Sequence, residues 1–178
     1  MPDVTTIIEN DHREVDGLFA AHSAATTSEE KDTIVEQIRL ALAPHAAAEE
    51  ILVYPAVRRA TKDGDDKAGH AIDEHKEIKR ILAEVDKMSA GDTTRDQKIR
   101  ELQQAVEHHV EEEERDVLPR LRAGMDAERL EQMGDLFQKM KPLLPTHPHP
   151  LVPGTATAQL LAGPLASVAD HIRDFVDR

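Results

Sequence analysis

The sequence of 178 residues contains no cysteine, no tryptophan, one tyrosine and three phenylalanines. Without cysteine there is no disulfide, no thiolate metal ligand and no cysteine nucleophile. Because aromatic residues are scarce, the core must be aliphatic, which suits helix-on-helix packing better than a β-sandwich. We therefore expect an all-α protein, and the length is sufficient for one domain with a substantial core.

Basic residues are also few: 22 lysines and arginines stand against 35 aspartates and glutamates, for a net charge of −13. Because phosphate backbones and anionic membrane surfaces repel such a chain, we expect neither nucleic acid nor a membrane as partner. No apolar run approaches the roughly 20 residues of a membrane span, and the first residues show no signal-peptide pattern. We accordingly expect a cytoplasmic protein.

Ten histidines are many for this chain, and some of them occur in a repeat. Two segments share a histidine, an acidic pair and a proline, and align His45 with His109, Glu49 with Glu113, Glu50 with Glu114 and Pro55 with Pro119. A histidine and a glutamate four residues apart lie on one helix face, about 40° apart around the axis. Two such pairs that face each other across a bundle would form a metal site.

Apolar residues recur at helical spacing in four long stretches, at about residues 3–25, 28–60, 65–88 and 94–122. Ser28 is expected to cap the second helix, Pro44 to kink it, and residues 61–66 to form a turn. His12 lies 33 residues before His45, and His75 lies 34 residues before His109. The chain thus contains a duplicated helical hairpin, which predicts an up-down four-helix bundle with pseudo-two-fold symmetry.

The character of the chain changes after the fourth helix. A shorter helix is predicted from Ala127 to Lys141, then a Pro-rich connector at residues 142–153 without regular structure, and a last amphipathic helix that opens at Gly163. We therefore divide the chain into a four-helix bundle at residues 1–122 and a C-terminal extension of two extra helices at residues 123–178. We expect the extension to cover one end of the bundle.

A lone histidine on an apolar helix face is more often a satisfied core residue than a metal ligand. The glutamates on the same faces are harder to explain, because an unpaired buried carboxylate costs several kcal/mol and a cation would compensate for it. Two alternatives are that the helices rotate to expose the acids, or that the bundle is an interaction module without metal. Neither explains why histidine and glutamate interrupt the apolar face at equivalent places in both halves.

The expected metal ligands are His12, His45, Glu49, His75, His109 and Glu113. Imidazole and carboxylate ligands without sulfur suit iron, manganese or zinc. With both carboxylates bridging, the protein offers about eight bonds where two six-coordinate metals need about twelve, so about four positions remain for a bridging oxygen and small ligands. A single tetrahedral zinc would leave ligands unused, so a pair of iron ions fits best.

This order of ligands, with a proline after each acidic pair, resembles the hemerythrin-like (HHE cation-binding) family over about residues 1–122. The resemblance implies a non-haem centre of two iron ions with a bridging oxo or hydroxo group inside a four-helix bundle. It also implies that Glu49 and Glu113 bridge the irons and that each histidine is a terminal ligand. Ferritin-like di-iron proteins use Glu-x-x-His instead, which is not the motif repeated here.

The chain departs from the oxygen-carrying members of that family, which have a fifth histidine four residues from another on the third helix. The corresponding positions around His75 are Ala71 and Lys79. One iron is then less saturated, which favours reaction with hydrogen peroxide, a catalase-like disproportionation in which neighbouring acids carry protons. The alternatives are reversible binding of oxygen or nitric oxide, and sensing of iron or oxygen, at the same site.

Other residues are weaker candidates. On a regular helix Tyr54 lies about 180° from His45, so we expect it to pack or to support a ligand, with direct iron ligation as the alternative. Glu50 and Glu114 are expected to orient imidazole N–H groups, and His70 is a minor ligand candidate. The remaining histidines have no place in the repeat: His22, His108, His147, His149 and His171. The two in the Pro-rich connector, His147 and His149, could bind stray metal.

Overall fold

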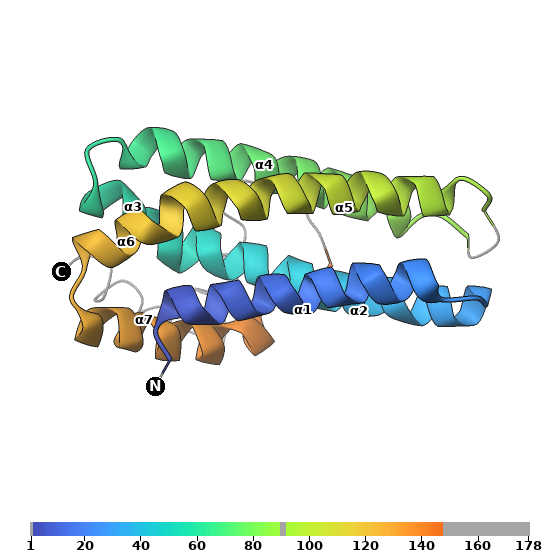
Figure 1. The fold of residues 1–178 in the computed structure, drawn as a ribbon, viewed down its shortest axis with the longest axis horizontal. Coiled ribbons are helices and arrows are strands. Elements are labelled where there is room, and N and C mark those ends of the chain that lie inside the picture. The colour runs from blue at the N-terminus through green and yellow to red at the C-terminus, as the bar shows by residue number, and fades with distance from the viewer. Residues whose placement is uncertain (1, 90–91, 148–178) are drawn as a thin grey trace.

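A computed structural model describes residues 2–89 and 92–147, and every regular element in these ranges is helical. The predicted all-α, up-down four-helix bundle is confirmed (Figure 1). Its four long helices are α1 (Val4–Ala24), α2 (Ser28–Ala48), α4 (Gly64–Val85) and α5 (Arg95–Glu112). α1 packs beside α2 and α4 beside α5, as expected for two hairpins. Within the described ranges, no helix is long and apolar enough to cross a membrane.

The helix ends lie within a few residues of their predicted positions. Asp3 caps α1 by accepting hydrogen bonds from two backbone N–H groups. Thr27, and not Ser28 as predicted, caps α2: its side chain accepts from the Glu30 N–H at 3.2 Å, and the Glu30 carboxylate accepts from the Thr27 N–H at 3.1 Å. This reciprocal capping box fixes the start of α2 one residue earlier than the prediction. The predicted turn is also shorter, because α4 already begins at Gly64.

Both α2 and α5 widen into a π-turn, at Glu49–Val53 and Glu113–Val117. In the first, the Tyr54 N–H donates to the Glu49 carbonyl, five residues back. In the second, the Leu118 N–H donates to the Glu113 carbonyl in the same way. Each π-turn inserts one extra residue into the helix and rotates everything after it relative to the residues before it.

A proline follows each π-turn, Pro55 at the start of α3 (Tyr54–Ala60) and Pro119 at the start of α6 (Leu118–Gly124). Because proline has no N–H, it cannot donate a regular helical bond at these positions. Pro44, at which a kink was predicted, lies inside α2, which remains α-helical to Ala48. The π-turn that follows begins at Glu49.

The buried apolar residues form two separate cores. One lies at the end of the bundle with α3 and α6, and includes Ile8, Leu52 and Leu121. The other lies toward the loops that join α1 to α2 and α4 to α5, and includes Phe19 and Leu102. Between the two cores, each long helix passes through a layer of buried histidine and glutamate.

The helix α7 (Ala127–Met140) lies along α1 (Figure 1) and buries Phe137 in the first core. A short 3₁₀ turn at Lys141–Leu143 follows and extends into the first residues of the predicted Pro-rich connector. Several predictions lie outside the described residues: the part of the Pro-rich connector after His147, the last amphipathic helix, and any role of His149 and His171.

Candidate metal centre

The layer between the two cores contains all six predicted ligands. Each long helix contributes one histidine, and the π-turns after α2 and α5 each begin with a glutamate. All six are nearly inaccessible to solvent, with at most 7% of the residue surface exposed: His12, His45, Glu49, His75, His109 and Glu113. The sequence-predicted set is therefore brought together in the bundle interior.

Each glutamate faces one histidine from each half of the duplication. The Glu49 Oε1 lies 3.1 Å from the His45 Nε2, and the Glu49 Oε2 lies 3.3 Å from the His75 Nε2. The Glu113 Oε2 lies 3.4 Å from the His12 Nε2 and 3.8 Å from the Nε2 of the histidine on α5. Glu49 thus belongs to two triads of possible ligand atoms, His12–His45–Glu49 and Glu49–His75–His109, each within 4.8 Å.

The buried polar atoms of this layer fit a cation. The Nε2 atoms of His12 and His45 and all four carboxylate oxygens of Glu49 and Glu113 are buried without a hydrogen-bond partner. A buried polar group without a partner costs about 1–3 kcal/mol, and a charged group costs more. A metal cation would supply the missing partner to nitrogen and oxygen atoms alike. The donor set, imidazole and carboxylate without sulfur, suits transition metals such as iron, manganese and zinc.

The outer nitrogens of the four imidazoles each have a carboxylate partner. These contacts join the His45 Nδ1 to Asp11 at 2.9 Å, the His12 Nδ1 to Glu114 at 2.9 Å, the His75 Nδ1 to Glu50 at 3.1 Å and the His109 Nδ1 to Glu74 at 2.9 Å. A hydrogen on Nδ1 donates to the acid, so that the Nε2 lone pair is directed into the centre. The four acids therefore fix the orientation that a metal ligand needs.

Only two of these acids were proposed from the sequence, Glu50 and Glu114. Asp11 and Glu74 were not predicted, although each directly precedes a histidine of the repeat and the two positions align with each other. An acid next to a histidine in sequence points away from it on the same helix, so this adjacency does not identify the partner. Asp11 and Glu74 reach the histidine of the neighbouring helix instead.

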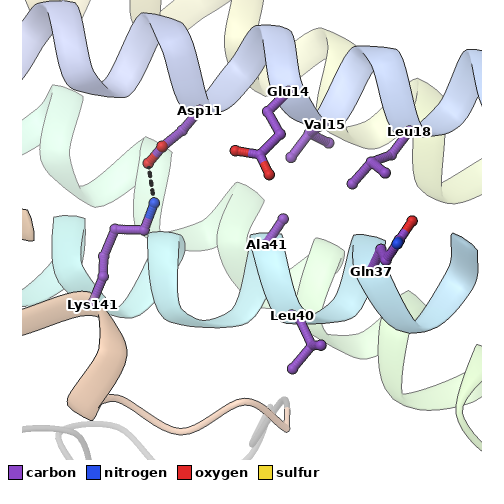
Figure 2. A pocket seen from close by; sticks show the side chains of 8 residues that line it. All are labelled: Asp11, Glu14, Val15, Leu18, Gln37, Leu40, Ala41 and Lys141. Atoms are coloured by element: carbon purple, nitrogen blue, oxygen red, sulfur yellow. Dashed lines mark hydrogen bonds and ion pairs between the residues drawn. The ribbon is translucent and has the colours of Figure 1, made fainter.

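Lysines hold two of the supporting acids in turn. The Lys79 Nζ lies 2.5 Å from the Glu50 Oε1, and the Lys141 Nζ lies 2.6 Å from the Asp11 Oδ2. Figure 2 shows Lys141 reaching Asp11 beside a surface pocket of about 380 Å³ between α1 and α2. Since Lys141 directly follows α7, the segment after the bundle supports His45 through Asp11.

Tyr54 lies in the centre, and not on the opposite face as a regular helix would place it. Its side chain is fully buried, and its hydroxyl lies 3.1 Å from the His75 Nε2. The angle expected for a regular helix does not apply, because the π-turn at Glu49–Val53 adds one residue between His45 and Tyr54. Burial and the nearby carboxylates, Glu113 first among them, hold the pKa of the Tyr54 hydroxyl well above its usual value. The tyrosine is therefore a neutral hydrogen-bond donor.

The charges of the centre depend on each other. Burial lowers the pKa of His45, but the carboxylates of Glu49 and Asp11 outweigh it and raise the pKa to about 10. Burial raises the pKa of Glu49, but His45 and His75 outweigh it and hold the pKa well below its usual value. A metal ion would take the place of the imidazole protons as the partner of the carboxylates.

The remaining described histidines lie outside this layer. His70 and His108 are on the surface, with side chains 57% and 62% exposed. His22 is buried far along α1, with its Nε2 3.9 Å from an Asp96 carboxylate oxygen. His147 is exposed beside Asp86. The structure thus does not bring His70, a minor candidate, into the central layer.

A family model described as the hemerythrin HHE cation-binding domain matches residues 3–121. The chain belongs to the hemerythrin family. The resemblance seen in the sequence is confirmed, and the matched region covers the four long helices and both π-turns. Membership of this family supports the binding of a metal cation. The candidate ligands for it are the buried histidines and glutamates of the central layer.

One relative and one solved structure are named for the same domain. An uncharacterized hemerythrin-like protein of Schizosaccharomyces pombe is 27% identical over 179 residues, which span 100% of this chain and 88% of that protein. A protein of Nostoc named a DNA nickase is 29% identical over 138 residues, 78% of this chain and 39% of its own length. A crystal structure of a hemerythrin HHE cation-binding-domain protein from Mycobacterium kansasii has a TM-score of 0.70 at 20% identity, covering 97% of this chain and 99% of that one, and so shares the fold.

Glu50→Gln is expected to lower the affinity of the centre for metal about 10- to 100-fold, because it weakens the partner that orients His75. A competition titration with a chelator measures the affinity. Glu77→Gln is the matched control, since Glu77 lies on the exposed face of α4 and pairs with Arg80. Equal affinity in both variants would reject the orienting role of Glu50.

Proposed function

We propose that this hemerythrin-family protein holds two iron ions and disproportionates hydrogen peroxide, two molecules of which give one of oxygen and two of water. The six buried side chains of the central layer are the proposed ligands, with Glu49 and Glu113 bridging. The pair of irons, joined by a bridging oxygen, would supply the two-electron redox chemistry. The orphaned oxygens of both glutamates and the orphaned Nε2 atoms support the assignment.

The observation that carries the peroxide proposal is that neither position four residues from His75 holds a metal-ligating side chain. The positions four residues from His75 are Ala71, which is buried in the apolar core, and Lys79, whose amino group is bound to Glu50. Neither side chain can complete the coordination on this side. An unfilled position admits an exogenous small ligand, whereas a saturated metal would limit the chemistry.

Tyr54 is the residue best placed to assist that ligand. Its hydroxyl lies 3.1 Å from the His75 Nε2, the ligand atom of α4 in the central layer. A small molecule bound next to His75 would therefore accept a hydrogen bond from a buried, neutral phenol. Such a donor stabilises charge on a bound oxygen atom without an added ionic charge.

Reversible binding of oxygen or nitric oxide is the second candidate function. The same Tyr54 hydroxyl would donate to a bound diatomic ligand as well as to peroxide. We do not propose a nuclease activity from the Nostoc relative, because the match covers 39% of that protein and the chain carries a net charge of −13, unsuited to phosphate backbones.

Oxygen evolution from the iron-loaded protein after addition of hydrogen peroxide tests the proposal. We expect steady turnover, and we expect it to be lost when the iron is removed. Exposure of the reduced protein to oxygen provides the contrast: a reversible coloured adduct, with no evolution of oxygen from peroxide, would reject the peroxide proposal in favour of a carrier.

Tyr54→Phe is expected to lower the peroxide turnover number on the order of 10²-fold while iron content stays unchanged, because only the hydroxyl is removed. Turnover and iron content are measured on the same sample. Phe137→Leu is the control, since Phe137 contacts the His45 ring from α7 and lacks a hydroxyl. Full activity of Tyr54→Phe would contradict the role of the phenol.

A further inference from the structure

A second set of histidines and carboxylates lies at the surface, outside the central layer. His70 and Glu74 are on α4, and His108 and Glu112 are on α5. Each pair is a histidine followed four residues later by a glutamate, the same spacing as in the central pairs, so each pair shares one helix face. Because α4 and α5 lie side by side (Figure 1), the two pairs face each other.

The four side chains approach one another through four nitrogen–oxygen contacts, and Glu112 also faces Arg115 at 3.8 Å. The His70 Nε2 lies 3.5 Å from the Glu74 Oε1 and 3.2 Å from the Glu112 Oε2. The His108 Nε2 lies 3.5 Å from the same Glu74 oxygen and 3.8 Å from the Glu112 Oε1. Each imidazole thus faces both carboxylates. Ligand atoms of His70, Glu74 and Glu112 all lie within 4.8 Å of one another, and His108 approaches the same Glu74 oxygen from α5 as a possible fourth ligand of a cation.

An orphaned atom points into this set. The Glu74 Oε1 is buried without a hydrogen-bond partner, while the other oxygen of Glu74 holds the His109 Nδ1 at 2.9 Å. A cavity of about 10 Å³ next to it is lined by His70, Glu74, Glu112 and the central Glu113, among others. The surface set therefore lies directly outside the central layer, and its buried oxygen lacks the partner that a cation would provide.

The duplication does not account for these residues. In the other half of the repeat, the equivalent positions hold Ile7, Asp11, Pro44 and Ala48. There Lys141 neutralises Asp11, the counterpart of Glu74. In the second half, two imidazoles face Glu74 instead. Histidines at positions 70 and 108 are thus a feature of this half alone.

We propose that His70, Glu74, His108 and Glu112 bind one divalent transition-metal cation, separately from the central pair. Imidazole nitrogen and carboxylate oxygen are ligands that Zn²⁺, Fe²⁺ and Co²⁺ accept. The excess of acidic residues attracts cations to the surface. Because both imidazoles are more than half exposed, the ion reaches the site from solvent without any opening of the bundle.

A titration of the iron-loaded full-length protein with Co²⁺ tests this site, after dialysis and measurement of the iron content. Calorimetry counts the bound ions, and the visible absorption of Co²⁺ reports its coordination. We expect about one additional equivalent with the spectrum of a four-coordinate ion. We expect that equivalent to be lost in His70→Ala/His108→Ala, with the iron content unchanged.

His147→Ala is the matched control, because His147 is an exposed histidine beside Asp86 and away from α4 and α5. It should retain the additional equivalent. Glu112→Gln provides a second variant that changes one surface group, and it should weaken Co²⁺ binding at least tenfold. The proposal is overturned if the wild type binds no additional Co²⁺, or if His70→Ala/His108→Ala binds as much as His147→Ala does.

Discussion

Replacing Glu49 with alanine is expected to remove most of the iron from the protein while the bundle stays folded. Glu49 is fully buried, and its two oxygens face the imidazoles of His45 and His75, one from each half of the chain. It is the residue shared by both triads of ligand atoms, so its loss weakens both metal positions together. Iron per chain, measured by elemental analysis beside the circular dichroism of the same sample, gives the result.

Glu111→Ala is the control for this substitution. Glu111 precedes the second π-turn, is largely exposed and pairs with Arg115, so its loss should change neither iron content nor fold. Peroxide turnover should disappear in Glu49→Ala and persist in Glu111→Ala. If Glu49→Ala kept its iron, the assignment of the central ligands would be wrong.

Removal of the metal is expected to lower the midpoint of thermal unfolding by roughly 10 °C. A ligand present at 1,000 times its dissociation constant stabilises the native state by about 4 kcal/mol, and each kcal/mol shifts the midpoint of a chain of this size by about 2–4 °C. The physical source is the layer of orphaned nitrogen and oxygen atoms between the two cores, which a cation satisfies. Thermal scans with and without a chelator measure the shift.

Glu49→Ala/Glu113→Ala separates this effect from other actions of the chelator. Without both buried carboxylates the variant should unfold at the same temperature in the presence and absence of chelator. If the iron-loaded and chelated wild type unfolded at the same temperature, metal would not stabilise the fold. That result would contradict the prediction drawn from the buried atoms without hydrogen-bond partners.

Much of the fold followed from the sequence because the relevant signals are local and repeated. Apolar residues at helical spacing predict the four long helices, and the matched intervals His12 to His45 and His75 to His109 predict their pairing. The same repeat placed six polar side chains on inward faces. In the structure these side chains form a layer between the two apolar cores, at the points where they interrupt the apolar helix faces in the sequence.

The position of Tyr54 did not follow, because it depends on a π-turn. The angle between Tyr54 and His45 is close to 180° only if the helix is regular, and the extra residue at Glu49–Val53 rotates the tyrosine toward His75. Pro55 marked the place in the sequence. A proline alone, however, does not distinguish a π-turn from a kink or a helix end.

Side-chain contacts between neighbouring helices could not be predicted from the sequence either. Asp11 and Glu74 support histidines on neighbouring helices, and only the packing of those helices reveals the partner. From the sequence, His70 was a minor candidate for the central site and His108 had no place in the repeat. Their common approach to Glu74 appears only when α4 and α5 lie side by side.

Elemental analysis of the purified, iron-supplemented protein, together with its near-ultraviolet absorption, tests the central claim most directly. Six inward side chains, in which Glu49 and Glu113 each face two histidines, predict about two iron ions per chain and an oxo-to-iron charge-transfer band. A protein that takes up no iron, or a single ion without that band, would contradict the proposed pair of metals bridged by Glu49 and Glu113.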